Sequence, residues 1–153
     1  MNTFLSEDTH WMQHALRLAA QAEAEGEVPV GAVLVLAGQA IGEGYNRVIS
    51  ANDPTAHAEV LALRQGALAV GNYRLLEATL YVTLEPCTMC AGAMVHARIK
   101  RLVYGAADER TGAIHSQAAV LEQSFLNHRV CAEGGLLSAP CSEILRSFFK
   151  SRR

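Results

Sequence analysis

The feature that most constrains this chain is a pair of short motifs, His57-Ala58-Glu59 and Pro86-Cys87-Thr88-Met89-Cys90. Two thiolates and one imidazole form a ligand set that suits zinc. The 26 residues between the motifs (60–85) can form one helix and one strand, which would return the chain to the same point. We therefore expect a fold in which the two motifs meet, with His57, Cys87 and Cys90 as zinc ligands.

The number of ligands favours a catalytic site. A structural zinc site usually closes with a fourth protein ligand, whereas a catalytic site keeps that position for water. Glu59 stands two residues after the histidine, where it could act on such a water without binding the metal. Two alternatives are a cytosolic C-x-x-C redox motif and a structural zinc site with one further Cys or His ligand. The candidates for that fourth ligand are Cys131, Cys141, His96, His115 and His128.

Length and composition indicate one domain, spanning residues 1–153, because 50% of the residues are hydrophobic and only 18% are charged. The N-terminus carries Glu7 and Asp8 where a signal peptide would be basic. No apolar run approaches the roughly 18 residues of a membrane span. We expect a soluble intracellular protein that does not act at a membrane. In a reducing compartment, Cys131 and Cys141 are predicted to be buried or half-buried thiols.

Charge is distributed unevenly along the chain. The formal net charge is −2, but residues 98–153 contain nine basic and five acidic side chains. A polyanion such as RNA should therefore meet the C-terminal part. The alternative is a solvated helix end, since basic residues there favour the helix dipole.

The hydrophobic pattern alternates between strands and helices. Helical spacing predicts helices at 6–25, 53–71, 87–96 and 138–150, and a short one at 117–123. Apolar runs predict strands at 28–36, 40–45, 80–84, 100–105 and 129–132, with a hairpin turn at Ala37–Gln39. This order predicts an α/β domain whose partly parallel sheet is covered by helices on both faces. The three proposed ligands would then lie at two helix N-termini that converge on one face of the sheet.

Several segments together resemble the bacterial tRNA-specific adenosine deaminases, from about Trp11 to Arg153. The H-x-E and P-C-x-x-C pair is shared by zinc-dependent nucleobase deaminases. The remaining similarity is carried by Val28–Val33, Gly44–Arg47, Asp53–Glu59, Tyr81–Met94 and Thr111–Ala113.

The resemblance implies a three-layer cytidine-deaminase-like fold with a central mixed five-stranded sheet. It implies a cytoplasmic homodimer with one zinc per subunit. The activity would be hydrolysis of a C–N bond in a cyclic amidine: the wobble adenosine (position 34) of a tRNA, chiefly an arginine tRNA with an ACG anticodon, would become inosine. The sequence departs from the family mainly at 115–123 and in the last helix.

Carried over by position, Glu59 would be the catalytic proton shuttle. It would take a proton from water and pass it to N1 of adenine, while zinc-bound hydroxide attacks C6 and ammonia leaves. The base must lie outside any stack, which the anticodon stem-loop permits in its single-stranded loop. The residues that would line the base pocket are Val28, Pro29, Val30 and Asn46, and those that would contact RNA are Asp108, Arg152 and Arg153.

Two other functions fit the same motifs. One is deamination of a free base or nucleotide of the cytosine or guanine type, because the metal motif is common to that superfamily. The other is a binding module with a structural zinc and no catalysis. For the subunit contact, an exposed Met94 on the helix after Cys90 is the candidate, although core packing explains this residue equally well.

Overall fold

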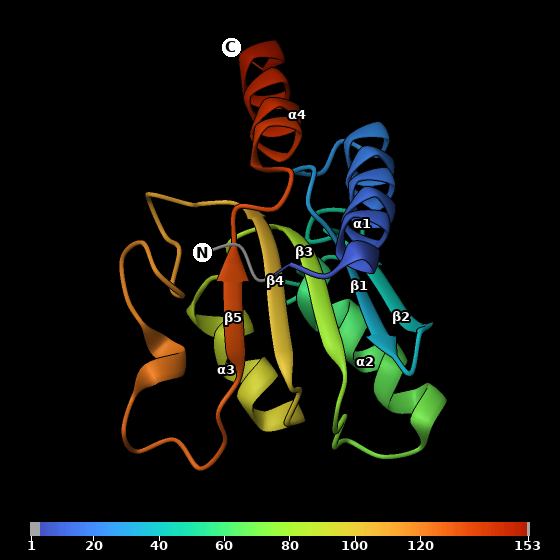
Figure 1. Ribbon diagram of the computed structural model, residues 1–153. Helices are drawn as coiled ribbons and strands as arrows, with labels where there is room; N and C mark the ends of the chain where they lie inside the picture. Colours follow the sequence, from blue (N-terminus) through green and yellow to red (C-terminus); the bar gives the residue numbers. More distant parts are fainter. Residues whose placement is uncertain (1–3, 153) are drawn as a thin grey trace.

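The computed structural model describes residues 4–152 and forms three layers around one five-stranded sheet (Figure 1). The strands lie in the order β2-β1-β3-β4-β5; β1 pairs antiparallel with β2 and β3, and β3, β4 and β5 are parallel. The predicted α/β class with a mixed sheet is confirmed. In chain order the elements are α1 (Ser6–Ala24), β1 (Gly31–Leu36), β2 (Gln39–Tyr45), α2 (Ala58–Val70), β3 (Thr79–Leu84), α3 (Thr88–Ala97), β4 (Arg101–Ala106), the 3-10 turn η1 (Val120–Glu122), β5 (Cys131–Gly134) and α4 (Ser138–Ser151).

Each face of the sheet is buried under a separate pair of helices. Helix α1 covers one face, where Met12 and Ala15 pack on Val33 and Val103. The start of α4 packs on the same side at the ends of β3 and β4, and the rest of α4 projects beyond the sheet (Figure 1). Helices α2 and α3 cover the other face, where the larger core cluster includes Met94. Side chains alternate between faces along a strand, so the apolar runs in β1, β3 and β4 supply both clusters. Met94 is fully buried, so the suggestion that it forms a subunit contact is wrong and its core interpretation is correct.

The helix boundaries differ from the prediction mainly at two places. Helix α2 begins at Ala58 rather than Asp53, because the Asp53 carboxylate accepts hydrogen bonds from the backbone and hydroxyl of Thr55 and closes a turn there. The helix predicted at 117–123 is only the single turn η1. In both stretches, backbone amides donate hydrogen bonds to acceptors two or three residues away. The spacing of residues in the sequence does not distinguish such a local turn from the start of a helix.

The strand predictions hold within a few residues. The first strand begins at Gly31, so 28–30 precede it. The hairpin is tighter than predicted: Gln39 already pairs with Leu36, and only Ala37 and Gly38 turn the chain, both with positive φ (51° and 76°). Two such residues match the type I′ turn that suits the twist of paired strands.

One glycine of β2 allows α2 to approach the sheet closely. A Cβ atom added to Gly44 would lie 2.3 Å from the carbonyl oxygen of Ala58. This is far inside van der Waals contact, so a side chain is excluded at this position. Because Ala58 is the first residue of α2, Gly44 sets the distance between the start of that helix and the sheet.

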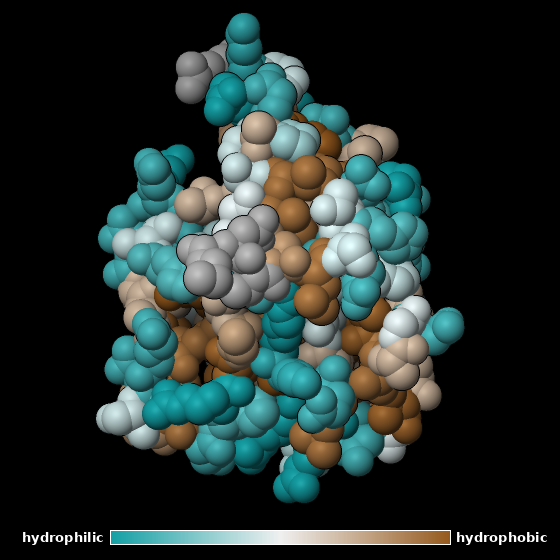
Figure 2. Space-filling view, in the orientation of Figure 1, coloured by the Kyte–Doolittle hydropathy of each residue, from teal (hydrophilic) through white to brown (hydrophobic). Residues whose placement is uncertain are grey.

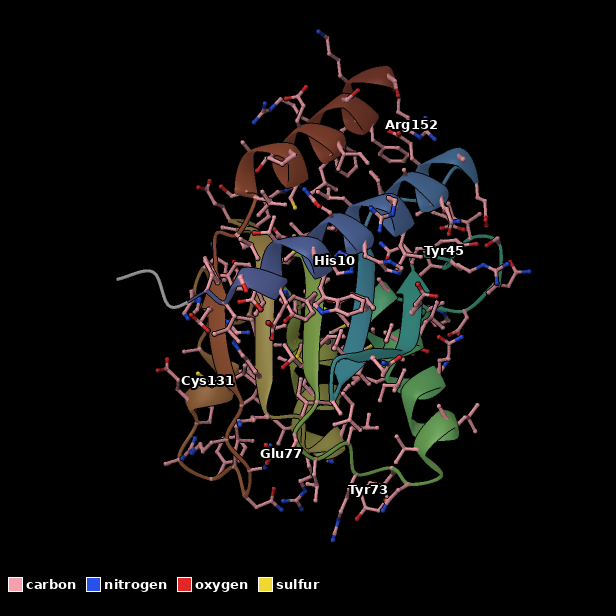
Figure 3. All side chains as sticks on the ribbon, turned by 45° about the vertical axis from the view of Figure 1, so that its right-hand side comes forward. His10, Tyr45, Tyr73, Glu77, Cys131 and Arg152 are labelled. Atoms are coloured by element: carbon pink, nitrogen blue, oxygen red, sulfur yellow. The ribbon has the colours of Figure 1, made fainter. Side chains whose placement is uncertain are left out.

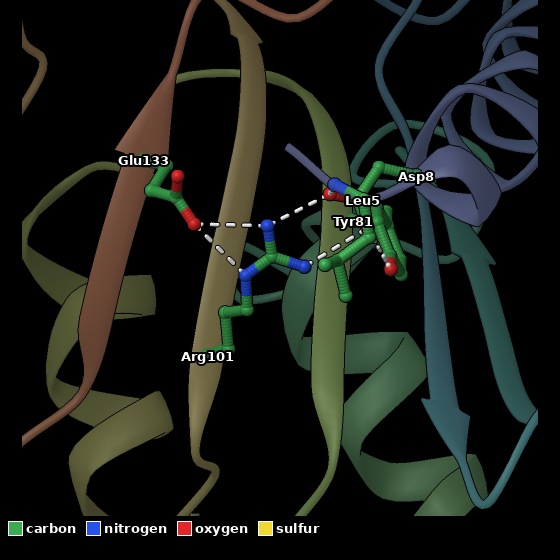
Figure 4. A network of polar contacts seen from close by, with 5 residues as sticks. All are labelled: Leu5, Asp8, Tyr81, Arg101 and Glu133. Carbon is green, nitrogen blue, oxygen red and sulfur yellow. Dashed lines mark hydrogen bonds and ion pairs between the residues drawn. The ribbon is translucent and has the colours of Figure 1, made fainter. Parts of the chain in front are cut away.

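A buried ion-pair network fastens α1 to the sheet (Figure 4). Asp8 is fully buried and accepts hydrogen bonds from Arg101 (2.9 and 2.7 Å), the Tyr81 hydroxyl (2.6 Å) and the Leu5 amide (2.7 Å). Arg101 also donates to Glu133 of β5 (2.9 Å). All the lone pairs of the buried carboxylate thereby face donors, which is the condition for burying a charge.

One cysteine is more exposed than predicted. Cys131 is exposed on the outer edge strand of the sheet (Figure 3), whereas Cys141 is buried as expected. Figure 2 shows hydrophilic residues at the free end of α4 and hydrophobic residues where α4 meets α1. Within residues 4–152, no helix combines the length and apolar character that crossing a membrane requires.

Candidate active site

The two sequence motifs meet where α2 and α3 begin. His57 is the N-cap residue of α2, Cys87 is the N-cap residue of α3, and Cys90 lies in the first turn of α3. The Nδ1 atom of His57 lies 3.6 Å from the Cys87 sulfur and 3.5 Å from the Cys90 sulfur. The predicted convergence of the two helix starts is therefore present, and both positive dipole ends point to one spot.

The spacing of these atoms fits tetrahedral zinc. With Zn–S bonds of about 2.3 Å and Zn–N bonds of about 2.05 Å, the N···S edges of a tetrahedron are about 3.6 Å. Within residues 4–152, the group of potential ligands at this spot contains these three side chains and no other His, Cys or carboxylate. A site with three protein ligands keeps one position open, as catalytic zinc sites do. None of the five residues considered as a structural fourth ligand joins the group.

The two cysteine thiols have opposite pKa shifts. Hydrogen bonds from Cys90 and His57 lower the pKa of Cys87 to about 4, although burial acts in the opposite direction. The pKa of Cys90 is raised, chiefly because its thiol donates to Cys87 and because it is buried. One thiolate thus exists at neutral pH, and a metal ion would displace the remaining proton from Cys90.

Glu59 lies beside this group in the first turn of α2. Its side chain is 4% exposed, and burial raises its pKa to about 7, with a smaller contribution from the negative charge of Cys87. A carboxyl group with a pKa near neutral can both accept and release a proton.

A pocket of about 210 Å³ opens onto Glu59 and His57. Its volume lies below the ~300 Å³ at which sites for drug-sized ligands begin, so it suits a single base. Of the predicted pocket residues, Val28, Val30 and Asn46 line it. Pro29 is buried in the segment before β1 and does not line the pocket.

Asn46 connects the pocket wall to the metal-binding helix. Its side-chain oxygen accepts a hydrogen bond from the Ala58 amide (2.9 Å), which satisfies one of the open donors at the start of α2. Within residues 4–152, its NH₂ group has no acceptor, so it can donate to a ligand in the pocket.

Of the residues predicted to contact RNA, Asp108 lines the pocket, whereas Arg152 lies at the end of α4. Asp108 lies at the rim and lines the pocket, where its carboxylate accepts bonds from the Arg110 and Thr111 amides (3.0 and 3.1 Å). Arg152 lies at the far end of α4 (Figure 3), where its guanidinium stacks 3.9 Å from the ring centre of Phe148. Arg153 lies outside the described residues.

A second hollow, of about 590 Å³, continues from the pocket along α4 and shares Val28 and Asp108 with it. Phe149, which is 51% exposed, and Leu145 form its α4 wall. The sequence analysis did not single out either residue, although a large exposed aromatic residue on an amphipathic helix is a recognisable signal of a contact surface. This second hollow, hereafter the groove along α4, is positioned to accept the part of a substrate that is attached to a base in the pocket.

Two buried acids beside the pocket were also missed. Glu27, fully buried, accepts from the Ile49 and Ser50 amides (3.2 and 2.7 Å), and so holds the loop after Asn46. Glu85, 2% exposed, holds the loop on the opposite side. Although burial opposes it, hydrogen bonds from Ser116 and neighbouring amides lower the pKa of Glu85, so this group is charged at neutral pH.

Comparisons with known proteins all identify deaminases. The sequence profile of the MafB19-like deaminases matches residues 6–153. The tRNA-specific adenosine deaminase of Haemophilus influenzae is 56% identical over 147 residues, which is 95% of this chain and 85% of that protein. A solved structure from studies of A-to-I editing by tRNA:A34 deaminases at the wobble position of transfer RNA has a TM-score of 0.87 and 47% identity, and covers 90% of this chain and 99% of that chain. This superposition confirms the predicted cytidine-deaminase-like architecture.

A guanine deaminase from Bacillus subtilis is also similar. Its solved structure has a TM-score of 0.62 and 41% identity, covering 70% of this chain and 66% of that chain. The similarity is therefore more extensive to the tRNA-specific enzymes than to this free-base deaminase.

Proposed function

Because this chain belongs to the bacterial tRNA-specific adenosine deaminases, we propose that it converts the wobble adenosine (position 34) of a tRNA to inosine. The preferred substrate is an arginine tRNA with an ACG anticodon. The observation that carries the proposal is the buried Glu59 beside a His57–Cys87–Cys90 group at the floor of a base-sized pocket. Residues 1–153 form a single deaminase domain in this proposal.

The reaction consumes water and releases ammonia. Zinc held by His57, Cys87 and Cys90 would supply the Lewis acidity that makes a water oxygen nucleophilic toward C6 of adenine. The Glu59 carboxylate takes one proton from that water and gives it to N1. It then takes the second proton, from the hydroxyl formed at C6, and gives it to the amine, which leaves as ammonia. The Asn46 amide donates to the base and orients it, while Val28 and Val30 exclude water from its sides.

The groove along α4 supports a polynucleotide substrate. A target base can enter the pocket only after leaving its stack, and an anticodon loop permits this at low cost. The nucleotides beside it would lie against Asp108 and Phe149. Arg152, the C-cap residue of α4, and Arg153, the next residue in the sequence, are proposed to contact phosphates.

We also propose a cytoplasmic homodimer with one zinc per subunit. An apolar hollow of about 260 Å³ between α2 and α3, lined by residues such as Val60, Ala67 and Ala93, offers a surface that a second subunit can cover. The nearby Leu68 and Tyr73 are 85% and 63% exposed.

The test is inosine formation at position 34 of an arginine tRNA with an ACG anticodon. Wild type should produce inosine, whereas Glu59→Ala should produce none while retaining one zinc per chain. Gel filtration with light scattering tests the dimer in the same preparation. Failure of zinc-loaded wild type to form inosine would contradict the proposal.

The similarity to the guanine deaminase makes free-base deamination the second candidate. It predicts ammonia release from guanine or cytosine by wild type, without inosine in the tRNA. A module with structural zinc alone predicts neither product.

A further inference from the structure

Glu85 is a buried acid to which the proposed reaction gives no task. It follows β3 directly and stands two residues before Cys87. No lysine or arginine in the described range 4–152 forms an ion pair with it. A buried carboxylate without a cation must be satisfied by hydrogen bonds.

Five donors converge on this carboxylate, and all come from one loop. The Asp108 amide (3.0 Å) and the Ser116 hydroxyl donate to Oε1. The amides of Ile114 (3.1 Å), His115 (2.9 Å) and Ser116 (2.9 Å) donate to Oε2. The segment 108–116 is thus folded around a single side chain.

The loop leaves no space at this contact. A Cβ atom added to Gly112 would lie 2.4 Å from the Cδ atom of Glu85. The Gly112 amide donates to the Asp108 carbonyl (2.8 Å), and the Ala113 amide donates to the carbonyl of Pro86 (2.9 Å). Loop, acid and the segment leading to Cys87 therefore form one packed unit.

The same loop forms one wall of the pocket and of the groove. Asp108 and Thr111 line both hollows. The orientation of the Asp108 side chain depends on the loop backbone, because its carboxylate accepts from the Arg110 and Thr111 amides. A wall that is fixed before the substrate arrives avoids the cost of ordering it during binding.

We propose that Glu85 is a positioning residue that holds segment 108–116 as a preformed wall for the RNA on either side of the target base. This inference rests on the proposed function. Although Glu85 stands two residues before Cys87, none of its five donors comes from α2 or α3, the helices whose first turns carry Glu59 and the metal-binding side chains. The effect of Glu85 therefore falls mainly on substrate binding rather than on the chemical step.

The experiment is Glu85→Gln, which keeps the size of the side chain but replaces one acceptor oxygen by an NH₂ group facing the loop donors. We expect KM for the anticodon stem-loop to rise about tenfold, while kcat changes less than about threefold. Zinc content should remain one per chain. Hydrogen–deuterium exchange at the amides of Asp108 and of residues 114–116 should become faster.

Two further variants separate positioning from stability. Gly112→Ala presses a methyl group against the same carboxylate and should raise KM in the same way, even if Glu85→Gln does not fold. Asp8→Asn removes another buried carboxylate on the opposite face of the sheet and should leave KM unchanged.

An unchanged KM in Gly112→Ala, or loss of zinc or kcat without a rise in KM in Glu85→Gln, would overturn the inference. If wild type forms no inosine, the proposed function fails and the role in RNA binding fails with it. In that case, hydrogen–deuterium exchange still decides whether Glu85 holds the loop.

Discussion

Replacing Asp8 by Asn should destabilise the fold strongly, although Asp8 lies away from the pocket. Breaking a buried ion pair by removing one charge typically costs about 3–5 kcal/mol. The low end applies here, because Arg101 keeps its contact with Glu133 and the Asn side chain can still accept from the Tyr81 hydroxyl. A loss of about 3 kcal/mol corresponds to a fall in Tm of about 9 °C for a chain of this length.

The pH dependence identifies the cause of this loss. Burial alone would raise the pKa of Asp8, but hydrogen bonds from Arg101 and Tyr81 lower it below its ordinary value of 3.8. A lowered pKa in the folded state means that the charge stabilises the protein fully above about pH 4, and that this stabilisation is lost as the pH falls through the folded-state pKa. The gap between wild type and Asp8→Asn should therefore be constant from pH 5 to 8 and narrow below pH 4.

Urea denaturation followed by circular dichroism at several pH values measures this gap. Glu133→Gln is the matched control, because Arg101 keeps both bonds to Asp8 when this partly exposed carboxylate is neutralised, so the loss should be smaller than for Asp8→Asn. A gap below about 1 kcal/mol at pH 7, or one that stays constant down to pH 3, would refute the reasoning.

Three other changes test the turn, the pocket and the metal. Ala37→Asn should raise the free energy of unfolding by about 0.5 kcal/mol in urea denaturation, because Asn tolerates the positive φ of this type I′ turn better than Ala. Asn46→Asp keeps the bond to the Ala58 amide but loses the NH₂ donor, so inosine formation should fall more than about tenfold at unchanged Tm, whereas Asn46→Ala should also lose about 1 kcal/mol of stability. Chelation of the metal should abolish turnover and lower Tm in a differential scan, and added zinc should restore both.

The parts of the fold that could be predicted are those where local pattern and chemistry agree. The strand around Val33 is a continuous apolar run, and the strand around Tyr81 is rich in residues that favour strands. The ligand spacing left few ways to bring His57 and Cys87 together. The start of α2 was misplaced because Asp53 closes a local turn that has the same residue types as a helix cap.

What the sequence could not provide was the set of donors around each buried acid. Glu27 and Glu85 both stand beside apolar runs, which was the available signal. Their partners are backbone amides from loops far along the chain, and every residue type except proline supplies such an amide. Likewise, Cys131 is exposed because β5 is an edge strand, a property of strand order rather than of neighbouring residues.

The close contact between Gly44 and Ala58 determines which parts of the site tolerate mutation. Any side chain at Gly44 would move the start of α2, and with it His57 and Glu59, away from the cysteines. Among variants selected for activity, position 44 should remain glycine while Val48 and Thr111 at the pocket rim diversify. Substrate preference can then change at the rim without disturbing the chemistry at the floor of the pocket.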